Sequence, residues 1–317
     1  MTGFRWQLAD DDGGQPALFP EEELVERHVG RGEYAGLEFL HVNARRLIST
    51  VPAASRVPFR HTINAYRGCS HACVYCFARP THEYLGLGPG RDFDTKLVIK
   101  VNAVERLRAE LSSPRWTGEP IAMGTNTDPY QRCEARYRLT RGIVEVLGAA
   151  GNPFSILTKS TLILGDLDRL AAAARRTDVR ASFSIGTLDE EVWRATEPGT
   201  PHPRQRVDAV ARLNAAGVAC GVLVAPVLPG LSDSDDQLRQ VVRACVAAGA
   251  VSVSALALHL RAGVREHYLG WLAGYRPDLS ADYERRFRRA YQPAADQRAL
   301  ADRVRAMVAE ARGRRAP

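Results

Sequence analysis

The chain has 317 residues, of which 45% are hydrophobic and 25% are charged, and its formal net charge is +7. This composition is typical of a soluble globular protein that buries a sizeable core. The sequence has no window that approaches 18 consecutive apolar residues, which excludes a membrane-spanning helix.

The positive charge comes mostly from arginine, since the lysines are Lys96, Lys100 and Lys159. We attribute this preference to GC-rich codon usage, so the charge is weak evidence for a nucleic-acid partner. Three of the six cysteines lie within 69–76, and the N-terminal residues are acidic with no apolar leader segment. This pattern indicates a metal or cluster loop in a reducing cytoplasm and not a disulfide framework.

Apolar runs and helical patterns alternate from residue 58 onward. Six runs predict strands at 58–66, 120–128, 153–160, 179–189, 218–230 and 252–260. Five amphipathic segments predict helices between them, at 101–113, 138–151, 165–176, 203–217 and 234–250. Strands that are apolar throughout are typical of parallel strands covered by helices. We therefore expect an α/β fold whose parallel sheet is doubly wound or curved into an incomplete barrel.

The two ends of the chain flank this core. Residues 1–35 are polar and irregular, and we expect them to be poorly ordered or to wrap around the core. The C-terminal part is rich in arginine and predicts helices at 283–292 and 296–312. We divide the chain into an N-terminal extension, a core and a C-terminal helical extension, at 1–57, 58–260 and 261–317.

The segment YRGCSHACVYCFAR, from Tyr66 to Arg79, follows the first predicted strand and has the spacing C-x3-C-x2-C. Thiolates are soft ligands that suit iron–sulfur clusters or zinc. Three thiolates can bind three irons of a cubane and leave the fourth iron open to another ligand. A structural zinc ion is the alternative, with His71 or Cys133 as its fourth ligand.

This loop resembles the signature of the radical SAM superfamily, with Tyr75 as the aromatic residue before the third cysteine. The phrases NAYRGCSHACVYCFAR, GTNTDPYQ, LTKS and ATEPGTP are similar to uncharacterised bacterial members related to spore photoproduct lyase. The resemblance implies a partial (β/α)6 barrel with a [4Fe–4S] cluster on Cys69, Cys73 and Cys76. It also implies S-adenosylmethionine (SAM) on the open iron, cleaved by one electron from a donor such as flavodoxin or ferredoxin to a 5′-deoxyadenosyl radical.

Polar residues at the strand ends are candidates to bind SAM, because βα barrels place their ligands at the carboxyl ends of strands. The candidates are Gly124, Asn126, Thr127, Asp128, Lys159, Ser182, Ser184, Glu197 and Arg206, together with Tyr75 of the loop. Each also has a plain structural reading. Gly124 to Asp128 could form a capped turn, Lys159 and Arg206 could face solvent, and the two serines could fill the barrel.

The substrate is the open question. Spore photoproduct lyase, which repairs a thymine dimer, uses a cysteine on its second strand as a hydrogen donor, and Thr125 occupies that position here. This departure weighs against the DNA-repair activity, and Cys133 is a speculative alternative donor. The remaining hypothesis is a non-catalytic, zinc-stabilised nucleic-acid-binding protein, which the arginine-rich C-terminus would favour.

Overall fold

The computed structural model describes residues 24–313 except 53 and 56. Its centre is a seven-stranded sheet with the order β11 (Val253–Ala257), β10 (Ala219–Val227), β9 (Val179–Ser184), β8 (Phe154–Thr158), β7 (Ile121–Met123), β4 (His61–Ile63) and β3 (Ile48–Thr50). The strands from β4 to β11 are parallel, and β3 is antiparallel to β4. The six predicted strands are confirmed, each shorter than predicted.

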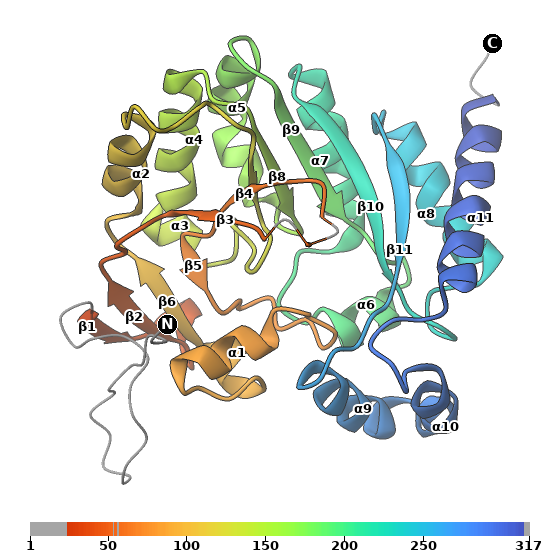
Figure 1. The fold of residues 1–317 in the computed structure, drawn as a ribbon. Coiled ribbons are helices and arrows are strands. Elements are labelled where there is room, and N and C mark those ends of the chain that lie inside the picture. Colours follow the sequence, from red (N-terminus) through yellow and green to blue (C-terminus); the bar gives the residue numbers. More distant parts are fainter. Residues whose placement is uncertain (1–23, 53, 56, 314–317) are drawn as a thin grey trace, which may run out of the picture.

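Helices cover the outer face of this curved sheet (Figure 1). The five predicted helices are present as α2 (Ala103–Leu111), α4 (Leu139–Ala150), α5 (Leu167–Ala174), α7 (Pro203–Ala215) and α8 (Asp235–Ala247). The strands β11 and β3 form the two ends of the described sheet order, so the barrel is open. The architecture is the partial (β/α)6 barrel expected from the sequence.

Local signals set the helix ends. Pro203 occupies the first turn of α7, and Gly217 follows its end with a φ of +82°. Ser234 and Gln237 form a capping box at the start of α8, in which each side chain bonds the other residue's backbone N–H. Because the strands from β4 to β11 are parallel, the loops that follow them lie on one side of the sheet.

A second, four-stranded sheet was not predicted. Its order is β1 (Leu24–Val29), β2 (Glu38–Val42), β6 (Lys96–Lys100) and β5 (Tyr66–Arg67). The expectation of an irregular segment at 1–35 is therefore wrong for β1, while residues 1–23 lie outside the described part. The strands of this sheet come from three distant regions of the chain, so their partners are invisible to a local pattern.

The C-terminal segment forms α9 (Val264–Tyr275), α10 (Pro277–Arg286) and α11 (Ala294–Gly313). The helix predicted at 283–292 is shifted, because Pro277 starts α10 and the chain leaves the helix after Arg286. The backbone of Leu260 donates to Ala290, and His259 forms a β-bridge with Tyr291. Within the described residues, the helices include none long and apolar enough to cross a bilayer.

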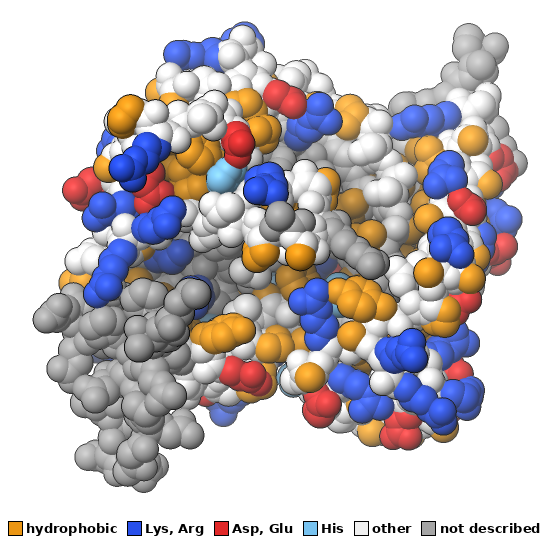
Figure 2. All heavy atoms as spheres, in the orientation of Figure 1, with side chains coloured by type: hydrophobic (Ala, Val, Ile, Leu, Met, Phe, Trp, Pro, Cys, Tyr) orange, Lys and Arg blue, Asp and Glu red, His pale blue; other side chains and the backbone are white. Residues whose placement is uncertain are grey.

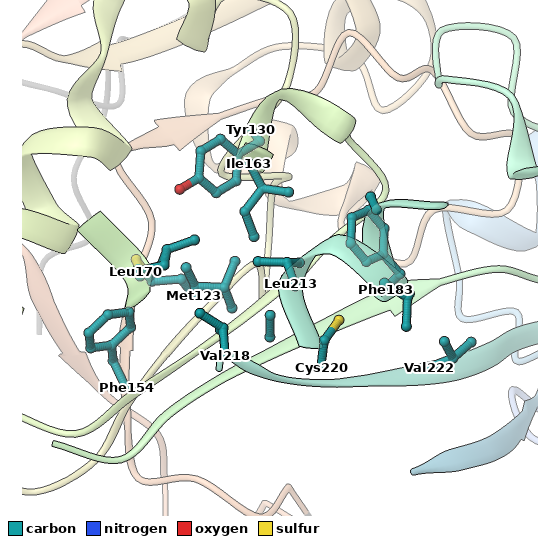
Figure 3. Packing of buried hydrophobic residues seen from close by; sticks show 14 of the residues in the cluster. Met123, Tyr130, Phe154, Ile163, Leu170, Phe183, Leu213, Val218, Cys220 and Val222 are labelled. Carbon is teal, nitrogen blue, oxygen red and sulfur yellow. The ribbon is translucent and has the colours of Figure 1, made fainter. Parts of the chain in front are cut away.

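The main core lies between the sheet and its helices. Figure 3 shows Met123, Phe154 and Val222 from the strands beside Leu170 and Leu213 from α5 and α7. All five side chains are at most 2% exposed. Burying an aliphatic or aromatic side chain of this size stabilises a fold by roughly 1.5–3 kcal/mol. The core therefore provides a rigid base for the loops at the carboxyl ends of the strands.

Candidate active site

A cavity of about 220 Å³ opens at the carboxyl ends of the parallel strands. The cysteine loop lines one side, and residues at the ends of β7 to β11 line the other. The cavity occupies the face where βα barrels carry their functional groups, as the sequence predicts.

The cysteine loop leaves β5 through a turn that requires glycine. Gly68 has a φ of +75°, and a Cβ atom there would lie 2.9 Å from the backbone oxygens of Phe93 and Lys96. The next amide, that of Cys69, donates to the Phe93 carbonyl at 2.9 Å. This close packing orients the first cysteine.

Arg79 holds the middle of the loop and was not singled out from the sequence. Its side chain is fully buried, and its Nη2 donates to the carbonyl of Cys73 at 2.9 Å. The same guanidinium pairs with Asp94 of α1 (Arg91–Thr95) at 2.9 Å and donates to the carbonyls of Pro89 and Gly90. A rigid fork of donors is suited to joining a carbonyl and a carboxylate in this way.

Gln131 fixes the loop to the residues after β7. Its Oε1 accepts from the amide of Ser70 at 3.0 Å, and its Nε2 donates to the carbonyl of Gly68 at 3.1 Å. Thr127 donates to the same Gly68 carbonyl at 2.7 Å. Thr127 lines the cavity, but its hydroxyl is bonded to the loop backbone.

The three loop cysteines are buried or half-buried, and each lines the cavity. Burial raises the pKa of all three thiols, and the charge of Asp128 adds to the effect at Cys69. Thiolates here consequently need a compensating positive charge. Iron ions would supply that charge, so this residue set fits an iron–sulfur cluster.

The spacing of the loop does not fit a single zinc ion. Among the described residues, the set of His, Cys, Asp or Glu ligand atoms that all lie within 4.8 Å of one another is Glu26, His28 and His41. Thiolates around one zinc ion stand ~3.8 Å apart, because each Zn–S bond is about 2.3 Å long. The sulfur atoms of the three loop cysteines do not all lie within 4.8 Å of one another, which suits ligands to separate irons. The two residues proposed as a fourth zinc ligand lie in other surroundings: His71 contacts Asp128, and Cys133 is buried in the main core.

Glu197 is the centre of a buried charge network beside the loop. It follows α6 (Glu190–Thr196), accepts a hydrogen bond from the Tyr75 hydroxyl, and pairs with Arg206 at 2.6 Å and Lys159 at 3.5 Å. Burial alone would raise the pKa of Glu197, but the charges of Arg206 and Lys159 outweigh it and lower the pKa to about 2. In this network two cations face one carboxylate.

Lys159 carries that positive charge to the cavity. Its Nζ donates to the hydroxyl of Ser184, which in turn donates to the carbonyl of Ala225 at 2.6 Å. The ammonium also lies 5.6 Å from the centre of the Tyr75 ring. Lys159, Ser184 and Tyr75 all line the cavity. The structure therefore brings these three predicted residues together with Glu197.

Asp128 braces the backbone. Its carboxylate accepts from the Thr158 hydroxyl at 2.6 Å and from the Lys159 amide at 2.7 Å, and it lies 3.4 Å from Nδ1 of His71. Burial opposes its ionisation, but His71 and these hydrogen bonds lower its pKa. Asp128 thus joins β7, β8 and the cysteine loop, and His71 is occupied by this contact.

The remaining predicted residues fall in different places. Asn126 is exposed and lines the cavity, as does Thr125, which accepts a hydrogen bond from Asn64 at 3.1 Å. Ser182 lies on β9 two residues before Ser184 and does not line the cavity. Cys133 is fully buried in the main core, away from the cavity lining.

Gly124 serves the sheet as well as the cavity. Its φ is +86°, and a Cβ atom there would lie 2.0 Å from the carbonyl oxygen of Leu157. The glycine therefore allows the end of β7 to approach β8 closely. The sequence argument gave Gly124 a role in ligand approach or in a capped turn, and it did not anticipate the close approach of the two strands.

Phe77 and His259 also line the cavity, and neither was predicted as a site residue. Their rings lie 5.9 Å apart, and His259 stacks on Tyr291 at 5.1 Å. Phe77 directly follows the third cysteine, so its place on the cavity lining could have been predicted from the sequence. His259 had no such signal, because its placement depends on the bridge to Tyr291.

Several arginines of the C-terminal segment pair with acidic side chains. Figure 2 shows Lys and Arg side chains over α9 and α10 at the lower right, interspersed with acidic ones. Arg285 and Arg286 both pair with Asp282, and Arg276 pairs with Asp278 at 2.6 Å. Because some of these arginines are held in ion pairs, arginine content alone does not define a nucleic-acid surface.

Comparison with known proteins agrees with this geometry. The model of the radical SAM superfamily matches residues 63–242. An uncharacterized protein of Mycobacterium tuberculosis is 45% identical over 303 residues, which cover 95% of this chain and 88% of the relative. A protein of Pseudomonas phage M6, named radical SAM Nalpha-GlyT isomerase, is 26% identical and covers 53% of this chain and 33% of its own.

A solved structure has a fold similar to that of this chain. Spore photoproduct lyase complexed with dinucleoside spore photoproduct superimposes with a TM-score of 0.61 at 17% identity, covering 86% of this chain and 79% of the lyase. At that identity the likeness concerns the fold alone. The family match spans more than half of the chain and includes the cysteine loop and four of the parallel strands that follow it. The chain belongs to the radical SAM superfamily.

Proposed function

We propose that Cys69, Cys73 and Cys76 hold a [4Fe–4S] cluster, and that the enzyme reductively cleaves SAM to act on a substrate still to be identified. The observation that carries this proposal is the arrangement of three thiols, buried or half-buried, on a cavity whose other side presents Lys159 and Ser184. When bound, the cluster supplies one electron to SAM, whose S–C5′ bond breaks to give methionine and a 5′-deoxyadenosyl radical.

The chain's own residues would bind and orient SAM. Lys159 would pair with the methionyl carboxylate, because its ammonium lies on the cavity wall and its charge exceeds what Glu197 neutralises. Ser184 and Asn126 offer hydrogen bonds to the polar parts of the molecule. Arg206 is 1% exposed and would act as a positioning residue through Glu197.

The part of the cavity lining at the ends of β10 and β11 would exclude water from the reaction. Leu223, Pro226 and Leu258 at the ends of β10 and β11 give it an apolar surface. A dry site protects a carbon radical from side reactions. We place the enzyme in a reducing cytoplasm, with flavodoxin or ferredoxin as the electron donor.

The test is anaerobic reconstitution with iron and sulfide, followed by dithionite and SAM. We expect about four irons per chain and release of 5′-deoxyadenosine, measured by liquid chromatography with mass spectrometry. Cys69→Ala should lose iron and product, while the matched control Cys245→Ala, a cysteine buried in α8, should keep both. Zinc without iron, or a complete cluster that releases no 5′-deoxyadenosine, would contradict the proposal.

A further inference from the structure

Two histidines and a glutamate gather on one face of the four-stranded sheet. In the antiparallel pairing of β1 with β2, Glu26 lies opposite His41, and His28 lies opposite Phe39. Alternate residues of a strand share a face, so Glu26, His28 and His41 point to the same side. One ligand atom from each of the three lies within 4.8 Å of the other two.

The donor atoms converge on one point. The Nε2 of His28 lies 2.9 Å from a carboxylate oxygen of Glu26, and the Nδ1 of His41 lies 3.9 Å from the same oxygen. The two imidazole rings have centroids 4.5 Å apart and are tilted by 58°. Two imidazoles and one carboxylate form a ligand set that suits zinc and similar divalent ions.

A fourth residue holds the ligand that lies deepest. The other ring nitrogen of His41, Nε2, lies 2.8 Å from the hydroxyl of Tyr137 in α3 (Glu134–Tyr137). With the proton on Nε2, this hydrogen bond leaves the lone pair of Nδ1 directed toward Glu26. Partners of this kind fix the tautomer and orientation of metal-binding histidines. Tyr137 is itself held against Phe39, with ring centroids 5.6 Å apart.

We propose that Glu26, His28 and His41 form a binding site for one divalent transition-metal ion of the zinc class, with water in its open position. The side chains of Glu26 and His28 are 57% and 32% exposed, so an ion and its water can reach them from solvent. None of the three lines the cavity that holds the cysteine loop. The site is independent of the proposed cluster, and the ion would tie β1 to β2.

A second histidine–carboxylate pair provides the comparison. His61 pairs with Glu119 at the start of β4 and packs edge-on against Trp116. The groups described around it do not include a third metal ligand. A His61 variant therefore serves as the control for metal binding by a simple histidine–glutamate pair.

The experiment is an anaerobic titration of the full-length, chelator-treated protein with Co(II), followed by displacement with Zn(II). We expect one equivalent with weak visible d–d bands of a nitrogen and oxygen site. Binding at the cysteine loop would instead give strong thiolate-to-cobalt charge-transfer bands in the near ultraviolet. His28→Gln and Glu26→Gln should each weaken binding of the d–d equivalent at least tenfold, and His61→Gln should leave it unchanged.

A Tyr137→Phe variant tests the hydrogen bond to His41. If the three residues bind a metal ion, we expect the loss of this bond to weaken metal binding roughly tenfold, whereas a simple ion pair would not depend on it. Thermal unfolding of each metal-free variant checks that the fold is intact. The proposal is overturned if only charge-transfer bands appear, or if His28→Gln binds Co(II) as tightly as His61→Gln. Neither result depends on whether SAM is cleaved.

Discussion

Replacing Glu197 by glutamine tests the buried charge network beside the cysteine loop. The substitution keeps the shape of the side chain but leaves the charges of Arg206 and Lys159 without their shared partner. The pKa of Glu197 is lowered from 4.5 to about 2. At about 1.36 kcal/mol for each pKa unit, ionised Glu197 contributes roughly 3 kcal/mol to folding at pH 7. Breaking a buried ion pair typically costs a similar 3–5 kcal/mol.

The same shift predicts a pH dependence. Because the pKa is lower in the folded state, the contribution is complete above the unfolded pKa of 4.5 and is lost as pH falls toward 2. The difference in unfolding free energy between wild type and Glu197→Gln should therefore shrink from roughly 3 kcal/mol at pH 7 to about 1 kcal/mol at pH 3. Other carboxylates titrate equally in both proteins and cancel in this difference.

Urea unfolding of the reduced, metal-free proteins at several pH values measures these quantities. Glu145→Gln is the matched control, since Glu145 pairs with Arg169 at 2.5 Å with both side chains well exposed. Such a surface pair contributes about 0–1 kcal/mol. A Glu197→Gln effect no larger than that of Glu145→Gln, or one that does not change between pH 7 and pH 3, would refute the reasoning.

Three further substitutions probe the cavity. Gly124→Ala places a Cβ atom against the Leu157 carbonyl at a positive φ, so we expect a loss of more than about 2 kcal/mol in urea unfolding; a loss below 0.5 kcal/mol would contradict the close approach of β7 and β8. Lys159→Met should keep the iron content but weaken SAM binding about tenfold or more, measured by calorimetry on the reconstituted protein, whereas unchanged affinity would remove Lys159 from the SAM site. Cys133→Ala should cost about 1 kcal/mol of stability because its side chain is buried in the core, with no effect on 5′-deoxyadenosine release; loss of release in a folded, cluster-loaded variant would reopen a direct role for this thiol.

The parallel sheet could be predicted because each of its strands carries its own signal. A strand such as β8 is a short apolar run between a glycine turn and a helix, and no knowledge of its partners is needed to recognise it. By contrast, β6 is three apolar residues between Lys96 and Lys100, which reads equally well as the approach to the following helix. Its strand character comes from its pairing with β2 and β5, and neither partner is close in sequence.

The same distinction applies to the candidate site, where some features could be predicted from the sequence and others could not. That polar groups gather near the cysteines follows from chain order, since the carboxyl ends of parallel strands share one edge. The chain order does not predict which of these polar groups face the cavity. Asp128 and Thr127 have the residue types of ligands, yet their oxygens bond to the backbone and side chains of the site itself. Arg79 has the residue type of a surface residue, yet it is fully buried and holds the Cys73 carbonyl.

These contacts narrow the chemistry that the proposed radical can undergo. Among the described residues that line the cavity, the thiols are those of Cys69, Cys73 and Cys76, which the proposed cluster would occupy. Thr125 also lines the cavity, and an alcohol O–H is too strong a bond to return a hydrogen atom to a carbon radical. A reaction that ends by restoring hydrogen to the substrate would draw it from 5′-deoxyadenosine, which regenerates SAM, from the weaker phenol O–H of Tyr75, which lines the cavity, or from a donor outside this lining. A reaction that ends in oxidation or in a new bond needs no such donor and consumes SAM, so regeneration of SAM during turnover would identify the return of hydrogen from 5′-deoxyadenosine.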